Sequence, residues 1–298
     1  MRRHPSLAIA LVVGVVSIST AALFVRQAAQ EAAPSLIAAG RMAGATILLA
    51  GSTFIFPRRH SVQVPRGCRR PIVWAGLFLG AHFYFWITSL SHTSVLSSVV
   101  IVTTNPIFVG LASYLFLKEP LHRSLVIGIV LAAFGGAMIA LADAAGRPGS
   151  LYGNFLSLCG AIMESCYLLI GRRVRRQVDN LSYILPVYAV AALLLVVVAS
   201  PHIADVVRLR PATFAYIALL AIIPQLIGHS CLNWALGYAS ATIVAVCIVG
   251  EPLGASVLAW AVLKEQIGLW QAVGAGFILA GIFFSTRECG AAKPEPTM

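Results

Sequence analysis

The sequence predicts an all-α membrane protein with ten transmembrane helices, arranged as two inverted repeats of five helices each. Three observations lead to this fold class. The 298 residues are 59% hydrophobic and only 10% charged, and the mean hydropathy of +0.89 implies more apolar surface than one soluble core can cover. Long apolar runs follow one another along the chain, and the two halves match at one constant offset. We expect a lipid bilayer around most of the protein.

Ten apolar runs are each long enough to cross about 30 Å of hydrocarbon as a helix. The first follows Met1-Arg2-Arg3-His4 and resembles a secretory signal. It lacks a small-x-small cleavage site, so we interpret it as a retained helix. In chain order the predicted helices cover residues 7–25, 34–56, 71–91, 94–117, 124–142, 151–171, 181–200, 212–236, 240–263 and 268–286.

The second half of the chain repeats the first without any gap. The pairs, each separated by 146 positions, are Leu90 and Leu236, Ser94 and Ser240, Pro106 and Pro252, Lys118-Glu119 and Lys264-Glu265, Gly128 and Gly274, and Gly135 and Gly281. We interpret this as a duplication with repeats at 1–145 and 146–287, followed by a disordered cytoplasmic tail at 288–298. Because each repeat has an odd number of helices, the second enters the membrane in the opposite orientation. Such inverted repeats build a site between their halves.

The basic residues predict how the helices are oriented. The net charge of +11 would indicate nucleic acid on a soluble domain, but here the basic residues occupy short loops, so we expect no nucleic-acid partner. With a cytoplasmic N-terminus, the other face carries five: Arg26, Arg147, Arg208, Arg210 and Lys264. The cytoplasmic face carries fifteen: Arg2, Arg3, Arg58, Arg59, Arg66, Arg69, Arg70, Lys118, Arg123, Arg172, Arg173, Arg175, Arg176, Arg287 and Lys293. This bias predicts that both termini are cytoplasmic.

Several classes of function lack their sequence signatures. There is no GxxxxGK[ST] nucleotide loop, no HExxH zinc motif and no CxxC pair among the six cysteines, so we expect no cofactor and no metal. An intramembrane serine hydrolase is an alternative, because the sequence around Ser256 resembles a nucleophile turn, with His82 or His229 as a base. Ser256 aligns with Gly110, however, which favours a packing role for a small residue.

Charged residues within the predicted helices are the strongest candidates for a site. A charge in the middle of a membrane helix costs about 2.5–3.5 kcal/mol, so Glu164 and Glu251 should face the protein interior. Because removal from water disfavours the charged form of a carboxyl group, either one is a candidate proton carrier or partner for a substrate amine. Arg41 lies in the second predicted helix and binds substrate, pairs with one of these acids, or extends to the interface.

Polar and aromatic side chains on several helices are predicted to face one interior. They are Gln225, His229 and Asn233 at i, i+4 and i+8 of the eighth helix, Phe78, His82 and Trp86 in the third, and Ser98 and Asn105 in the fourth. Hydrogen-bonding groups and rings together suit a pocket for a small amphiphilic molecule better than an ion pore. Each also has a structural interpretation, since rings pack helices or form interfacial belts and histidines satisfy a core.

Two prolines interrupt the predicted helices at matched positions, Pro106 and Pro252. Each leaves the carbonyl four residues before it without its helical donor. Membranes tolerate such breaks mainly where the helix faces protein or a water-filled cavity. We consider two interpretations: paired hinges beside a central cavity, and static kinks that fit the helices into the bundle.

The two repeats resemble the EamA domain of the drug/metabolite transporter superfamily. The residues that carry the resemblance are Pro106, Lys118-Glu119, Gly128 and Gly135 in the first repeat, and Glu251-Pro252, Lys264-Glu265, Gly274 and Gly281 in the second. The resemblance covers nearly the whole chain. It implies ten helices, cytoplasmic termini, a bacterial inner membrane, and secondary export of small metabolites such as amino acids or purine-like compounds. One departure is that Glu251 precedes its proline where the first repeat has Asn105, so carboxylate chemistry is one-sided.

We therefore expect alternating-access export of a small amphiphilic metabolite of the amino-acid type, aromatic amino acids included. Coupling to protons is open, and a facilitator of purine-like or drug-like compounds without coupling is an alternative. The oligomeric state is not predicted, although the spacing of Gly128, Ala132 and Gly136 offers a surface for helix contact.

Overall fold

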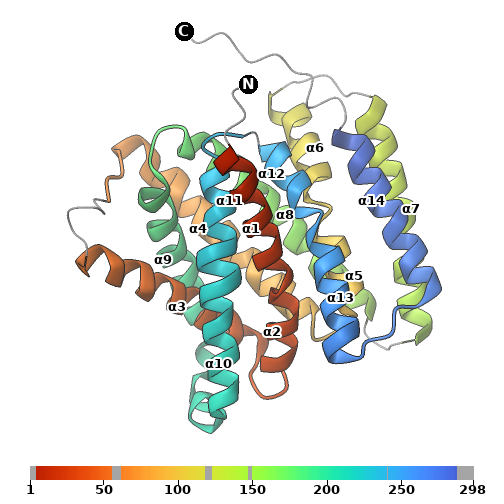
Figure 1. Cartoon of the computed structure of the whole chain (residues 1–298), viewed down its shortest axis with the longest axis horizontal. Coiled ribbons are helices and arrows are strands. Elements are labelled where there is room, and N and C mark those ends of the chain that lie inside the picture. The colour runs from red at the N-terminus through yellow and green to blue at the C-terminus, as the bar shows by residue number, and fades with distance from the viewer. Residues whose placement is uncertain (1–4, 56–61, 118–122, 147–149, 240, 287–298) are drawn as a thin grey trace.

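The computed structural model describes residues 5–55, 62–117, 123–146, 150–239 and 241–286, and in these ranges every regular element is a helix (Figure 1). The helices are α1 (Pro5–Ser19), α2 (Ala21–Ala28), α3 (Pro34–Ile55), α4 (Arg66–Ser89), α5 (Val95–Val102), α6 (Asn105–Leu117), α7 (Arg123–Gly146), α8 (Ser150–Arg175), α9 (Asn180–Ala199), η1 (Ser200–Arg208), α10 (Pro211–Leu220), η2 (Ala221–His229), α11 (Ser230–Ala235), α12 (Ala241–Ile248), α13 (Glu251–Leu263) and α14 (Leu269–Thr286). The predicted tail at 288–298 and the Lys118-Glu119 turn lie outside the described residues.

These helices form the ten predicted membrane spans. Eight stretches are long and apolar enough to cross a bilayer, and two shorter apolar helices, Val126–Ile139 and Leu269–Phe284, complete the set. Spans 1 to 5 are α1–α2, α3, α4, α5–α6 and α7. Spans 6 to 10 are α8, α9, α10–η2–α11, α12–α13 and α14. The fold class predicted from the sequence is confirmed.

The packing of the spans follows the symmetry of an inverted repeat. Span 3 packs against span 6, and span 8 packs against span 1. Exchanging the two repeats turns the first of these contacts into the second. Spans 5 and 10 also pack on each other, as do spans 2 and 7, and the same exchange leaves each of these two contacts unchanged, as a two-fold relation requires.

The glycines that match between the repeats lie at the contact of α7 with α14. A methyl group on Gly274 would lie 2.7 Å from the carbonyl oxygen of Gly135, and one on Gly281 would lie 2.6 Å from that of Gly128. Only hydrogen atoms fit between these backbones, so the helices need glycine here. Gly128 and Ala132 thus face α14 of the same chain, and the helix contact we considered between copies is an internal one.

The two proline breaks appear in the structure at matched places. Span 4 is interrupted at Thr103-Thr104 and span 9 at Val249-Gly250, and Pro106 and Pro252 are each the second residue of the helix that follows. Proline is suited to this position, because a helix start has no use for its missing N–H. Pro224 is a third mid-helix proline, which has no partner in the other repeat, and span 8 contains the π-helix η2 around it. One further irregularity was not predicted: span 1 is interrupted at Thr20.

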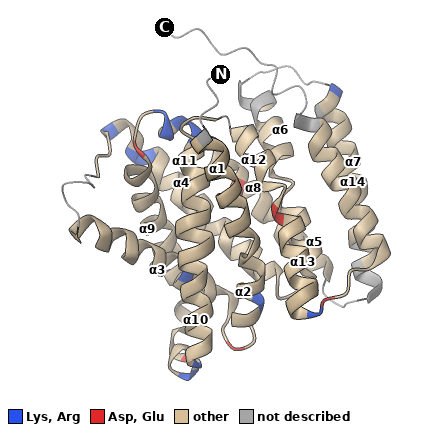
Figure 2. Ribbon diagram, viewed as in Figure 1, with Lys and Arg blue, Asp and Glu red and all other residues tan. Residues whose placement is uncertain are grey.

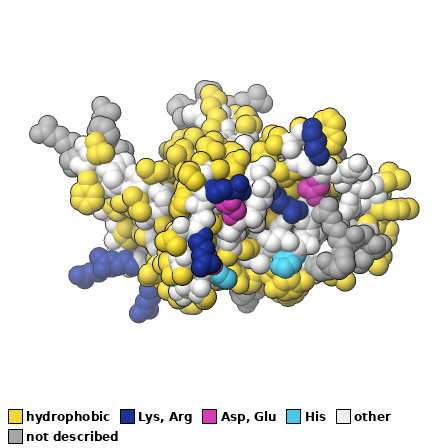
Figure 3. Space-filling view, turned by 90° about the horizontal axis from the view of Figure 1, so that it is seen from below, with side chains coloured by type: hydrophobic (Ala, Val, Ile, Leu, Met, Phe, Trp, Pro, Cys, Tyr) yellow, Lys and Arg dark blue, Asp and Glu magenta, His cyan; other side chains and the backbone are white. Residues whose placement is uncertain are grey.

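Charged residues gather at the two ends of the bundle, with a largely uncharged band between them (Figure 2). The end that carries the N-terminus holds the arginines at the start of α4 and those at the end of α8. At the opposite end, viewed in Figure 3, acidic and basic side chains lie together. There Glu31 accepts hydrogen bonds from Arg210 and from the hydroxyl of Thr213. The bond from Thr213 is the main reason that the pKa of Glu31 lies below its ordinary value.

Candidate functional site

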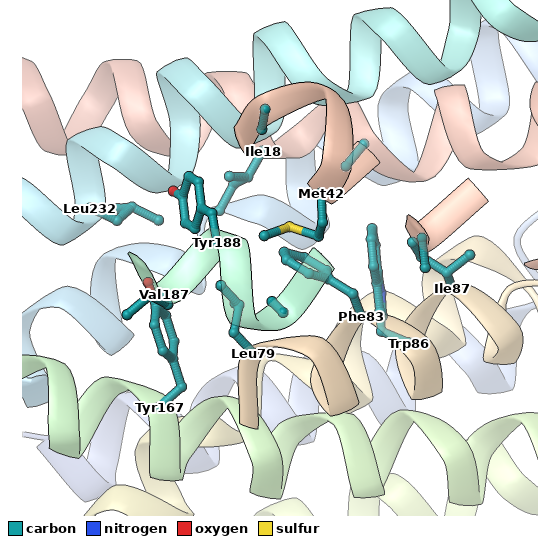
Figure 4. Close-up of a cluster of buried hydrophobic side chains, with 14 of the residues drawn as sticks. Ile18, Met42, Leu79, Phe83, Trp86, Ile87, Tyr167, Val187, Tyr188 and Leu232 are labelled. Carbon is teal, nitrogen blue, oxygen red and sulfur yellow. The ribbon is translucent and has the colours of Figure 1, made fainter. Parts of the chain in front are cut away.

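A small cavity, with a volume of about 20 Å³, lies between the two repeats. Seven of the ten spans contribute to its wall, through Ile18, Ala21, Arg41, His82, Phe83, Trp86, Val102, Glu164, His229 and Glu251. Figure 4 shows Ile18 of α1, Met42 of α3, and Phe83 and Trp86 of α4 in the cluster of buried apolar side chains. Glu164 lies about 21 Å along α8, a helix of 26 residues and so about 39 Å long. The cavity is therefore near the middle of the bundle.

Arg41 is the cation of this cavity, and its side chain is 0% exposed. Its Nε donates a hydrogen bond of 2.9 Å to Oε1 of Gln225, and its guanidinium carbon lies 3.9 Å from the centre of the Phe83 ring. Neither terminal nitrogen, Nη1 or Nη2, has a hydrogen-bond partner among the described residues. Glu251 and Glu164 interact with the guanidinium through space. The direct ion pair that we considered for Arg41 is replaced by the amide of Gln225 and a cation–π contact.

The two acids that were predicted to face the interior both line the cavity, and both are buried. Glu251 is the first residue of α13, directly after the break in span 9. Oε2 of Glu164 lies 4.0 Å from Nδ1 of His82. That nitrogen is 3.1 Å from the carbonyl oxygen of Gly160, which only accepts, so Nδ1 carries the proton and Nε2 of a neutral His82 is an acceptor.

Aromatic rings form the remaining wall. His82 stacks on Trp86 at 6.3 Å with an angle of 4° between the planes, and Phe83 meets His229 edge-on at 5.3 Å. Phe83 was not among the predicted site residues, since one phenylalanine in an apolar helix carries no signal. Its position 146 residues before His229 was the available clue. Phe78 points elsewhere, against the exposed Trp74.

The other predicted residues lie behind the cavity wall or farther away. Gln225 holds Arg41 from behind. The side chain of Asn105 lies beside the carboxyl group of Glu164 and interacts with it. Ser98 contacts the hydroxyls of Ser89 and Ser157. Asn233 accepts a hydrogen bond of 2.5 Å from Tyr167, in a network toward the end of the bundle that carries the N-terminus.

The cavity is symmetric in position but asymmetric in chemistry. Residues related by 146 positions line it or adjoin it in pairs: Ile18 with Glu164, Phe83 with His229, and Asn105 with Glu251. Both acids come from the second repeat, while Arg41 comes from the first and has Val187 as its counterpart. The cavity therefore presents charge of opposite sign from its two halves.

The catalytic alternative has no matching geometry. Ser256 lines a different, smaller pocket with Ser94 and Glu265, and its hydroxyl has no hydrogen-bond partner among the described residues. Both histidines proposed as its base line the central cavity instead. Within the part of the chain that the structure describes, no cluster of three His, Cys, Asp or Glu residues is arranged to hold a metal.

Comparison with known proteins gives consistent results. A sequence model of the EamA-like transporter family matches residues 6–141 and 151–287. Two uncharacterized transporters of Archaeoglobus fulgidus are similar: one is 22% identical and covers 69% of this chain and 72% of its own length, and the other is 23% identical and covers 73% and 78%. A crystal structure with 17% identity covers 95% of this chain and 96% of its own, with a TM-score of 0.66, which indicates the same fold. The chain belongs to the EamA-like transporter family of multi-pass membrane proteins.

Proposed function

We propose that this transporter exports a small zwitterionic metabolite of the amino-acid class, aromatic amino acids included. One observation carries the proposal: the cavity between the repeats joins two buried carboxyl groups and a wall of aromatic rings to an arginine, two of whose nitrogens have no partner in the described part of the chain. A zwitterion supplies the complement of each charge, because its carboxylate suits Arg41 and its ammonium suits Glu164 or Glu251.

The lining of the cavity supports the same class of ligand. Small-molecule sites are mostly apolar, with a few convergent polar groups, and this cavity combines apolar and aromatic side chains with Arg41, Glu164 and Glu251. Its volume of about 20 Å³ has room for little more than a water molecule, so the spans around it have to separate to admit an amino acid. Phe83 and Trp86 offer ring faces and edges to an aromatic or aliphatic side chain. Burial of the charges without a ligand is costly, so a ligand that neutralises them gains affinity from the arrangement.

Movement follows, in this proposal, from the symmetry of the repeats. The breaks before Pro106 and Pro252 lie in spans 4 and 9, which correspond to each other in the two repeats. Residues around such breaks absorb changes in backbone angle more readily than a continuous helix. The two prolines therefore act as hinges when the cavity opens alternately to either side.

The orientation in the membrane is also part of the proposal. The described helix ends next to the N-terminus carry Arg66, Arg69, Arg70 and the arginines at the end of α8. The positive-inside rule places this face in the cytoplasm. In a bacterial inner membrane, both termini are then cytoplasmic and the direction of net transport is outward.

A thermal-shift screen of the purified protein tests the class of ligand. Amino acids should raise the melting temperature, aromatic ones most, because each ligand that binds only the folded state stabilises it. Nucleosides and cationic drugs lack the carboxylate and should have little effect. Stabilisation by nucleosides or cationic drugs, with none by amino acids, would replace this proposal with the alternative of a purine or drug facilitator.

Proton coupling is a separate part of the proposal and has its own test. Glu164 and Glu251 are the candidate carriers, because they are the acids of the cavity. In liposomes containing the protein, an imposed pH gradient should change the rate and extent of amino-acid uptake relative to liposomes without a gradient. Equal uptake under both conditions would identify an uncoupled facilitator.

A further inference from the structure

The guanidinium group of Arg41 is held by protein contacts on one edge and one face, and the donors on its other edge are unsatisfied within the described part of the chain. Its Nε is bonded to Gln225, and one of its faces is covered by the ring of Phe83. The edge that carries Nη1 and Nη2 has no hydrogen-bond partner among the described residues, and Arg41 lines the cavity. Two parallel N–H donors at this spacing match the two oxygens of one carboxylate.

Gln225 holds this edge in place through an irregular piece of helix. It follows Pro224 within the π-helix Ala221–His229, and its side chain is fully buried. The counterpart of Gln225 in the first repeat is Leu79, which lies in the regular helix α4. The π-turn and the glutamine thus have no counterpart in the other repeat. Because only one repeat has them, they are not needed to build the five-helix fold that the repeats share. Single π-turns recur at functional sites.

We infer that the ligand's carboxylate binds end-on to Nη1 and Nη2 of Arg41, and that Gln225 is the positioning residue that reserves these two nitrogens for it. The inference rests on the proposed transport function and specifies how the ligand lies. The carboxylate faces the first repeat, and the amino group faces Glu164 and Glu251 of the second. Recognition of the carboxylate then determines specificity, since an amide or a decarboxylated amine leaves two buried N–H groups unpaired.

The test measures which analogues inhibit counterflow of radiolabelled phenylalanine in liposomes that contain the full-length protein. Unlabelled phenylalanine should inhibit, whereas phenylalanine amide and phenethylamine, which lack the carboxylate, should require about ten- to a hundred-fold higher concentrations. Equal inhibition by phenylalanine and phenethylamine would overturn the inference and leave transport of an amphiphile in place. Absence of any phenylalanine counterflow would overturn the proposed function itself.

Variants of Gln225 separate positioning from folding. Gln225→Leu should raise the KM for phenylalanine about tenfold with little change in maximal rate, because Arg41 is no longer held in one orientation. Gln225→Glu would place a carboxylate on Arg41, so it should remove the preference for phenylalanine over phenethylamine. A purely structural role would lower the activity for both ligands equally. Gln30→Leu and Gln30→Glu, at an exposed glutamine whose side-chain amide donates to Gln27, are the matched controls. Unchanged selectivity in both Gln225 variants would contradict the inference.

Discussion

At the scale of single residues, the structure separates side chains that both repeats need from those found in one repeat only. Arg41, Glu164, Gln225 and Glu251 have apolar or uncharged counterparts 146 positions away. All four are buried. Burying charged and polar groups in a membrane protein costs free energy, and such groups are usually kept for a function. The asymmetry of charge is therefore the chemical signature of the candidate site.

Phe83 is predicted to be a structural centre of the cavity wall. Its side chain is 0% exposed and contacts both Arg41 and His229. Phe83→Ala should lower the free energy of unfolding by about 3–5 kcal/mol, as for other large-to-small core substitutions, measured as a reduced melting temperature in detergent. Phe54→Ala, at a side chain that is 84% exposed, is the control and should have little effect. Equal melting temperatures for the two variants would contradict the assignment.

Much of this site could be predicted from the sequence, because intramembrane charge is rare. Glu164, Glu251 and Arg41 were identified from that fact alone, and His82, Trp86 and His229 from the faces they share with other polar or aromatic residues. The bond between Arg41 and Gln225 could not be predicted. It depends on a π-turn and on the packing of α3 against η2, and neither leaves a periodic pattern in the sequence.

At the scale of helices, the close contact of α7 with α14 explains why the same glycines occur in both repeats. Gly135 and the glycine next to it, Gly136, provide a matched test. A methyl group on Gly135 would collide with the backbone of Gly274, whereas one on Gly136 meets nothing within 4 Å. The two glycines are neighbours in the same helix, and they differ in whether an added methyl group would meet α14.

Gly135→Ala should therefore destabilise the protein by about 1–3 kcal/mol, the usual cost of overpacking. Gly136→Ala should be neutral or stabilising by about 0.5–1 kcal/mol, because alanine favours the helix. Thermal unfolding of both variants in the same detergent measures the difference. If Gly136→Ala were the more damaging of the two, the predicted helix contact would be wrong.

The helix boundaries show where sequence patterns lose information. Apolar length predicted all ten spans, and the prolines predicted the breaks in spans 4 and 9. The break at Thr20 has no proline and no matching break at Cys166, which lies within α8. It coincides with a hydroxyl that bonds back to the carbonyl of Ser17. Whether a side-chain hydroxyl competes in this way with the backbone hydrogen bonds of a helix depends on the residues packed around it.

At the scale of the whole molecule, the two repeats are joined at the end away from the N-terminus. Arg26 of α2 lies 3.8 Å from Glu265, which is in the loop before α14. Arg26 also donates to the carbonyl of Thr93 at 2.7 Å, and Glu265 accepts from the backbone of Val95 at 3.1 Å. Because the ion pair connects one repeat to the other, it has to break if this end opens.

Charge reversal at this ion pair tests whether it holds the end closed. Arg26→Glu or Glu265→Arg alone should increase the labelling of a cysteine at Ala21, which lines the cavity, by a membrane-impermeant maleimide in a cysteine-free background. The double variant restores opposite charges and should return labelling toward its original level. Labelling that is the same in all four proteins would show that the pair has no part in closure.

The central claim is that substrate passes through the charged cavity between the repeats, and counterflow in liposomes tests it most directly. Labelled phenylalanine should accumulate transiently in liposomes that contain the protein and an excess of unlabelled phenylalanine. Glu251→Gln should abolish this accumulation while leaving the melting temperature nearly unchanged. Asp205→Asn, at an acid that is 51% exposed, should retain it. Normal counterflow by Glu251→Gln would contradict the account and assign Glu251 to the scaffold.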